Sequence, residues 1–176
     1  GLTALQLGSL SATDFAEFTT TQLGALTKAQ ISGLSMTALN AIDPAVISGW
    51  TSAQVQGLSP YQLRNLSPSQ IGQLSTTQIA GLATTQIQSL SMSSLTGLTT
   101  TQLQVLSPAQ LGAISITNFS ALSAEQVAGL TNTQIQGLSA SQIAGLNATD
   151  FDELTDTQLS ALTANQIGAI STTNLF

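Results

Sequence analysis

An apolar residue recurs at every eighth position along the whole chain, and this period constrains the fold more than any other feature of the sequence. From Leu2 onward the residue at this spacing is apolar in all 22 copies, and we label the octad a to h from it. Position f is also apolar in all 22 copies, position b is Ser, Thr, Asp or Asn in 21, and position e is Gln in 15. Residues 1–176 therefore form a single continuous repeat array of 22 octads, in which we expect no separate domains.

Proline and glycine follow the same eight-residue register. All four prolines occupy position c, and all fourteen glycines occupy position g or h. Proline restricts the backbone whereas glycine frees it, so the repeat sorts two opposite backbone preferences into separate slots. The repeat is therefore a structural unit and not a low-complexity tract.

Each octad carries the features of a short helix. Ser or Thr at b, followed by Gln at e, forms a capping box, and the flanking apolar residues a and f form its hydrophobic staple. Proline at c occupies the first helical position, and glycine at h is expected to end the helix in a left-handed conformation. The sequence predicts an all-α solenoid with one helix of one to two turns per octad. The clearest capping pairs are Ser59 with Gln62, Ser67 with Gln70, and Ser107 with Gln110.

Two other architectures fit the pattern less well. In one continuous helix, eight residues advance about 80° beyond two full turns, so the apolar positions would spiral around the axis and form no stripe. A β-solenoid remains the alternative, because such folds also combine short repeats with inward-facing Leu and Ile. However, its strands should alternate apolar and polar residues, and the spacings here alternate between five and three.

The helices must stack to be stable. One octad buries two large side chains, worth roughly 1.5–3 kcal/mol each, whereas ordering its backbone costs about 1–2 kcal/mol per residue. Departures from Gln at e recur about every 3.3 to 3.5 octads, which predicts the number of octads per superhelical turn. The core is expected to be a thin ladder of a and f side chains, represented by Leu58, Leu63, Leu66, Ile71, Leu74 and Ile79.

The composition excludes several functions. Two basic and eight acidic residues give a net charge of −6, so no basic patch is available for nucleic acid or for an acidic membrane surface. The chain has no Cys and no His, which removes the usual thiolates, general bases and soft metal ligands. No apolar run is long enough for membrane insertion. We therefore expect no enzyme activity and no cofactor.

The carboxylates offer one weak candidate for a metal site. Asp150, Asp152, Glu153 and Asp156 lie close together in the sequence, and oxygen ligands of this kind suit Ca²⁺. The glycine turn and the distal glutamate of a calcium loop are absent. The favoured interpretation is therefore that Asp152, Glu153 and Asp156 lie near helix starts, where negative charge is favourable.

Hydroxyl and aromatic side chains suggest a second kind of site. Threonine tracts at Thr19–Thr21, Thr76–Thr77 and Thr99–Thr101 raise the idea of an ordered array that binds ice or a polysaccharide. Trp50 and Tyr61 are candidates for stacking on a sugar. Trp50 occupies an a position, however, so core packing is the better interpretation of its indole.

The segments Leu-Thr-Thr-Thr-Gln-Leu (98–103) and Leu-Ser-Thr-Thr-Gln-Ile (74–79) resemble the octapeptide repeats of very large repetitive bacterial exoproteins, of the haem-utilisation or adhesion type. The resemblance implies a secreted protein, associated with the cell surface or a biofilm matrix. The haem label does not carry over, because the usual axial ligands His and Cys are missing.

The sequence thus predicts a structural extracellular repeat protein that forms part of a self-assembling filament, matrix fibre or adhesin stalk. The alternative is a binding module that presents one face of the solenoid to a glycan, ice or Ca²⁺. Self-association is the expected partnership, with a glycan or a cell surface as the other candidate. Since terminal octads resemble internal ones, we expect the array to continue or to join end to end.

Overall fold

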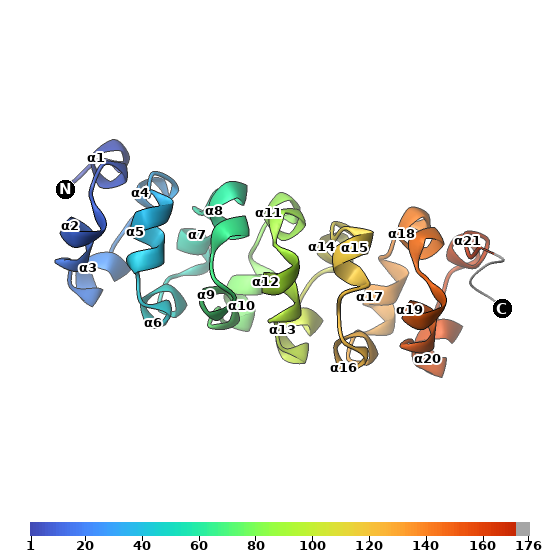
Figure 1. Ribbon diagram of the computed structural model, residues 1–176. Helices are drawn as coiled ribbons and strands as arrows, with labels where there is room; N and C mark the ends of the chain where they lie inside the picture. The colour runs from blue at the N-terminus through green and yellow to red at the C-terminus, as the bar shows by residue number, and fades with distance from the viewer. Residues whose placement is uncertain (172–176) are drawn as a thin grey trace. The chain divides into compact units, whose positions relative to one another are not determined.

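The chain forms one short helix per octad in the computed structural model, which describes residues 1–171 (Figure 1). The helices contain 4 to 6 residues each. Residues 1–171 contain no strand, so the all-α solenoid is confirmed and the β-solenoid is wrong. The helices are α1 (Ala4–Gly8), α2 (Ala12–Ala16), α3 (Thr20–Gly24), α4 (Lys28–Ser32), α5 (Met36–Ala41), α6 (Pro44–Ser48), α7 (Ser52–Val55), α8 (Pro60–Asn65), α9 (Pro68–Gly72), α10 (Thr76–Ala80), α11 (Thr84–Ser89), α12 (Met92–Thr96), α13 (Thr100–Gln104), α14 (Pro108–Gly112), α15 (Ile116–Phe119), α16 (Ala124–Ala128), α17 (Asn132–Gln136), α18 (Ala140–Gly145), α19 (Ala148–Asp152), α20 (Asp156–Ser160) and α21 (Ala164–Ile167).

The residue at b caps each helix as expected. In α8, Ser59 has an extended backbone, its hydroxyl accepts from the Gln62 N–H at 3.2 Å, and its own N–H donates to Gln62 Oε1 at 2.7 Å. Ala83 provides no side-chain cap, yet its N–H still donates to Gln86 Oε1 at 2.9 Å. The contacts that cap the start of each helix therefore lie within its own octad. The predicted pairs of α9 and α14 form the same capping box, with Ser67 and Gln70 in one and Ser107 and Gln110 in the other.

The helix ends differ from the expectation. No residue among 1–171 has a positive φ, glycines included, so the predicted left-handed glycine at h is wrong. Gly81, for example, ends α10 with φ −77° and ψ −11°, which is right-handed. The next residue then turns the chain by donating its N–H to the f carbonyl, as Leu82 does to Ile79 at 3.1 Å. A short 3₁₀-type turn therefore ends the helix without a left-handed residue.

Glycine is needed for a different reason at several of these positions, namely the close approach of another octad. A Cβ on Gly57 would lie 2.6 Å from the Lys28 carbonyl oxygen, and one on Gly137 would lie 2.6 Å from Pro108 Cα. The separation between these partners in sequence is about one superhelical turn. Glycine here allows two successive turns to pack backbone against backbone.

The chain divides into two compact units, Gly1–Gly97 and the part from Leu98 onward. Leu98 begins an octad like any other, so the sequence marks no boundary there. Within each unit a helix packs on the one three octads later, as α3 packs on α6 and α6 on α9 in the first unit (Figure 1). In the second unit α14 packs on α17, and α17 on α20.

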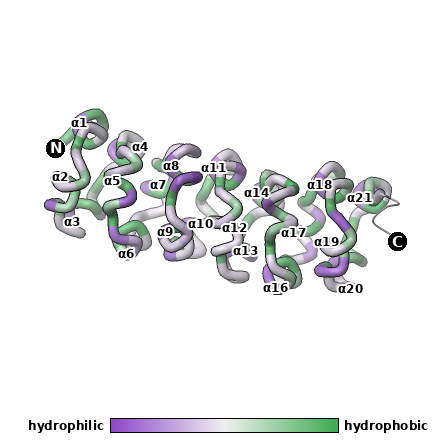
Figure 2. Tube along the Cα trace, viewed as in Figure 1, coloured by the Kyte–Doolittle hydropathy of each residue, from purple (hydrophilic) through white to green (hydrophobic). Residues whose placement is uncertain are grey.

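The core consists of the a and f side chains, which point inward. The predicted core residues are all buried, with exposed fractions between 0% and 3%: Leu58, Leu63, Leu66, Ile71, Leu74 and Ile79. Hydrophobic and hydrophilic segments alternate along the trace in step with the octad (Figure 2). Burial weakens at f positions in the final described octads, where Leu159 is 37% and Ile167 55% exposed. Asn174 and Leu175, the e and f residues of the last octad, lie outside the described residues.

We expect Gly57→Ala to destabilise the protein by about 1–3 kcal/mol, because the new methyl group would overlap the Lys28 carbonyl in the adjacent turn. The matched control is Gly24→Ala, since a Cβ on Gly24 would meet nothing within 4 Å. The control should be neutral or stabilising by up to about 1 kcal/mol. Urea unfolding followed by circular dichroism measures both, and equal midpoints for the two variants would contradict the close approach.

Candidate functional site

The glutamine side chain at e forms hydrogen bonds in two directions at once. Gln78 Oε1 accepts from the Ser75 N–H at 2.7 Å, which completes the cap of its own helix. Its Nε2 donates to the carbonyl oxygens of Ile47 at 3.1 Å and Trp50 at 2.6 Å. These acceptors lie 31 and 28 residues earlier, so one side chain joins a helix start to the preceding superhelical turn. Gln78 is only 2% exposed.

The same bond recurs with constant spacing in both units. Gln134 Nε2 donates at 2.8 Å to Leu103 and Leu106, again 31 and 28 residues earlier. We call the set of e-position glutamines that donate to a carbonyl 28 residues earlier the glutamine ladder: Gln30, Gln54, Gln62, Gln70, Gln78, Gln86, Gln126, Gln134, Gln142, Gln158 and Gln166. A separation of 28 residues is three and a half octads. The turn length agrees with the spacing expected from the sequence.

An amide suits this position better than a carboxylate does. Both groups can accept from the cap, but only an amide can also donate to carbonyl oxygens of the preceding turn. A carboxylate would bring negative charge against those oxygens in a buried place. This second role of the glutamine was not predicted from the octad pattern, although one signal for it exists in the sequence: position e is never Glu in this chain. Among the described residues, no buried side-chain nitrogen or oxygen lacks a hydrogen-bond partner.

The first turn shows the capping role alone. Gln6 Oε1 accepts from the Thr3 N–H at 2.8 Å and Gln22 Oε1 from the Thr19 N–H at 2.8 Å. Both glutamines are exposed, and the described residues include no turn before theirs that could supply carbonyl acceptors. The capping contact therefore forms without the contact between turns, which separates the two functions of the side chain.

Three glutamines at position g, Gln56, Gln104 and Gln136, tie the turns together in the opposite direction. Gln56 Nε2 donates to the Gly81 carbonyl at 2.7 Å, 25 residues later in the chain. In the second unit Gln104 donates to Gly129 at 2.7 Å, and Gln136 to Ala161 at 3.0 Å, with the same separation. Neighbouring turns are thus linked both by buried glutamines at position e and by exposed glutamines at position g.

Asp150 replaces glutamine in the octad of α19 and reverses the link between turns. Its carboxylate is 4% exposed and accepts from the Asn147 N–H at 2.7 Å. Because it cannot donate, the Ser120 hydroxyl donates to it at 2.9 Å from 30 residues earlier. Asp14 occupies the same slot in α2, where hydrogen bonds from the side chain and backbone of Ser11 lower its pKa below the ordinary value.

The acidic cluster does not assemble into a calcium site. Asp150 turns inward, and Asp156 begins α20 as expected. Asp152 and Glu153, however, lie at the C-terminal end of α19, so the prediction that they lie near helix starts is wrong. Burial and then the charge of Asp150 raise the pKa of Glu153. Within residues 1–171 no three Asp, Glu, His or Cys side chains are placed to hold a metal ion.

The aromatic candidates have separate environments. Trp50 is 3% exposed and its Nε1–H donates to the Leu23 carbonyl at 3.1 Å, which confirms core packing. Tyr61 is 68% exposed. The two rings therefore form no joint sugar platform. In the threonine tracts, Thr19 and Thr99 are N-caps whose hydroxyls accept from the backbone.

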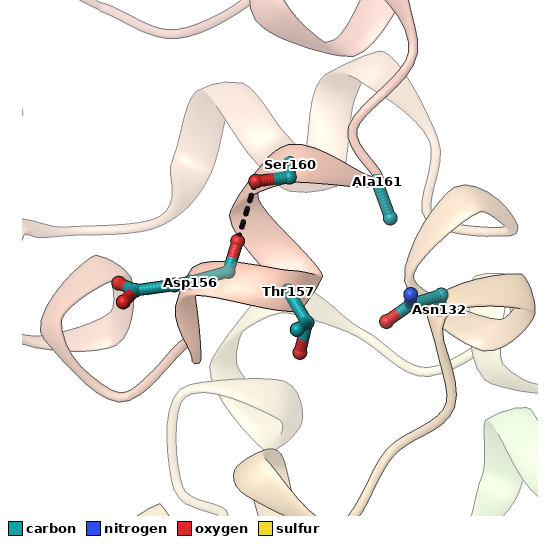
Figure 3. A pocket seen from close by; sticks show the side chains of 5 residues that line it. All are labelled: Asn132, Asp156, Thr157, Ser160 and Ala161. Carbon is teal, nitrogen blue, oxygen red and sulfur yellow. Dashed lines mark hydrogen bonds between the residues drawn. The ribbon is translucent and has the colours of Figure 1, made fainter.

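Open depressions lie between stacked helices. One of about 390 Å³ separates α17 from α20 and is lined by Asn132, Asp156, Thr157, Ser160 and Ala161 (Figure 3). The Ser160 hydroxyl donates to the Asp156 carbonyl at 2.7 Å, and the Asp156 carboxylate points away from Asn132. A similar depression separates α3 from α6. These hollows follow the stacking of the turns.

Residues 60–92 match the family model of the ALTTAQ repeat. The match covers helices α8 to α11, which include four members of the glutamine ladder: Gln62, Gln70, Gln78 and Gln86. No curated protein matches the chain. None of the described helices has the length and apolarity required to cross a bilayer. Sequence and structure together define a helical repeat protein of the solenoid class.

We expect Gln78→Glu to destabilise the protein by about 2–3 kcal/mol at pH 7, because a buried carboxylate would face the Ile47 and Trp50 carbonyls. Burial should raise the pKa of the introduced carboxyl above the unfolded value of about 4.3. Its protonated form can donate one hydrogen bond to these carbonyls, where the amide donates two. The loss of stability relative to the parent protein should therefore be small below about pH 4.3 and grow as the pH rises above it.

Urea unfolding at pH 4 and pH 7 measures this difference. The control is Gln6→Glu, which keeps the acceptor for the Thr3 N–H and loses no bond to another turn. The control should unfold like the parent protein at both values of pH. If the Gln78 variant were as stable as the control at pH 7, the hydrogen bonds that the Gln78 amide donates would contribute nothing to the free energy of unfolding.

Proposed function

We propose that the chain is a structural segment of an extracellular repeat protein, serving as part of a filament, matrix fibre or adhesin stalk. The observation that carries the proposal is the glutamine ladder. Each member joins its own helix cap to main-chain carbonyls one turn earlier, as Gln62 does to Ile31 and Leu34. The link relies on backbone acceptors, which every octad supplies.

Hydrogen bonds between successive turns suit a protein whose role is to bridge two points that are far apart. In a solenoid each turn is stabilised by its neighbours, so turns can be added without redesign of a central core. Tension between the ends must separate successive turns, which requires breaking the amide bonds at both e and g. The buried polar groups of the described residues are occupied by these structural bonds. This use of the buried polar groups supports the proposal of a structural role.

The surface and the sequence resemblance support an extracellular setting. Only 6% of the residues are charged, and exposed positions are mainly Ser, Thr, Gln and Ala. The chain contains no Cys, so its stability does not depend on the redox state of its compartment. The octapeptide resemblance to repetitive exoproteins points to secretion and to the cell surface or matrix.

Single-molecule pulling between the chain ends tests the mechanical role. We expect unfolding in discrete steps that each release about one turn of chain, followed by refolding on relaxation, because neighbouring turns are the cooperative units. A variant with Gln134→Leu and Gln142→Leu removes four hydrogen bonds between turns, two from each glutamine, and should unfold at lower force. The control, with Gln6→Leu and Gln22→Leu, removes capping contacts only.

If the parent chain extended smoothly from the lowest forces, as a flexible polymer does, the proposed mechanical role would be contradicted. Equal unfolding forces for the Gln134/Gln142 and Gln6/Gln22 variants would contradict the assignment of the resistance to the ladder.

A further inference from the structure

Four large apolar side chains in the first unit occupy outward positions that are otherwise small or polar. Positions c and d of the first twelve octads are mainly Ser, Thr, Ala and Pro, and Leu5, Met36, Tyr61 and Met92 stand out from them. Leu5 is 85%, Tyr61 68% and Met92 45% exposed, while Met36 is half-buried. None of the four belongs to the a and f core. We call them the apolar stripe.

The stripe follows the superhelical turn. Its members are separated by 31, 25 and 31 residues, and hydrogen bonds between turns in this unit join residues that are 25 to 31 apart. The helix that carries Met36, α5, packs directly on α8, which carries Tyr61. Leu5 lines a surface depression together with Gly33, three residues before Met36. The stripe therefore places one apolar residue per turn along one side of the unit.

Charged residues are scarce in the octads that carry the stripe. The four octads that carry the stripe contain no Asp or Glu, and Arg64 is their only charged residue. The carboxylates of the first unit, Asp14, Glu17 and Asp43, belong to the second and sixth octads. A surface that is apolar and free of carboxylates can be brought against an acidic protein without burying like charges.

We propose that the apolar stripe is the surface through which two copies of this chain associate side by side. A second copy is the occupant that fits, because it carries apolar residues with the same rise per turn. The two chains each have a net charge of −6, and repulsion between them is smaller along a face without carboxylates. This inference rests on the proposed structural function and gives it a lateral contact.

Tyr61 is the expected anchor of the contact. Its ring is the largest exposed apolar group of the stripe, and tyrosine is enriched at the centres of interfaces because it buries much area with little loss of side-chain entropy. Leu5 and Met92 extend the contact along the turns on either side. Met side chains adapt their shape to a partner surface, which suits a repeated contact between identical arrays.

Sedimentation equilibrium of the full chain over a range of concentrations tests the proposal. We expect the parent protein to associate, and the variant Leu5→Asp/Tyr61→Asp/Met92→Asp to show a dissociation constant at least about tenfold higher. The matched control, Thr21→Asp/Ala53→Asp/Thr77→Asp, places the same three charges at exposed d positions of other octads. The control should associate like the parent protein apart from general repulsion.

A second measurement uses the absence of Cys from the chain. Tyr61→Cys should form a disulfide-linked dimer on mild oxidation, whereas Ala53→Cys should stay monomeric at the same concentration. This pair is informative even if the triple variant fails to fold, which circular dichroism would reveal.

A parent protein that remains monomeric at the highest concentration would overturn the stripe proposal. Equal weakening by the stripe and control variants, or equal cross-linking of both cysteine variants, would also overturn it. A monomer that still unfolds in steps of one turn under force would leave the proposed structural function standing, so the two failures are distinguishable.

Discussion

A buried primary amide at position e is the contact on which the rest of this structure depends. Helices of 4 to 6 residues are far too short to be stable alone, because nucleation costs more than so few bonds return. The amide oxygen completes the cap of one helix, and the amide nitrogen binds carbonyls of the preceding turn. Local and long-range stabilisation are thus coupled in a single side chain, and neither requires a charged group.

The other recurrent features of the octad follow from the need to keep turns in contact with that amide. The a and f side chains form a narrow apolar interior, so the distance between turns must be short for the amide to reach. Glycine at g or h allows this approach, as at Gly57 and Gly137, where a Cβ would meet the neighbouring turn. Asp150 shows how the position accommodates a carboxylate, because the Ser120 hydroxyl of the preceding turn then donates the hydrogen bond.

Much of the local structure was predictable from the sequence because its causes are local. A capping box spans three residues, and proline at c and apolar residues at a and f act within one octad. The donor role of glutamine was missed because its acceptors lie 28 and 31 residues away, beyond the reach of an octad pattern. The predicted left-handed conformation of the h glycines was wrong for the same reason, since at Gly57 and Gly137 the close approach of another turn, and not a left-handed backbone, requires glycine.

Side chains at one repeat position can also diverge in function along the surface. Tyr61 and Thr77 occupy equivalent d positions, yet the first belongs to the apolar stripe and the second to a polar face. The fold imposes a turn of three and a half octads, which converts regular spacing in sequence into alignment in space. Sequence variation in the repeat is therefore interpretable only once the turn length is known.

The most direct test of the account is hydrogen exchange at the glutamine side-chain amides, followed residue by residue by NMR. Buried donors such as Gln134 and Gln142 should exchange orders of magnitude more slowly than the exposed Gln6 and Gln22, because exchange requires the turns to separate. If the buried glutamine amides exchanged as fast as those of the first turn, the glutamine ladder would not be what holds successive turns together.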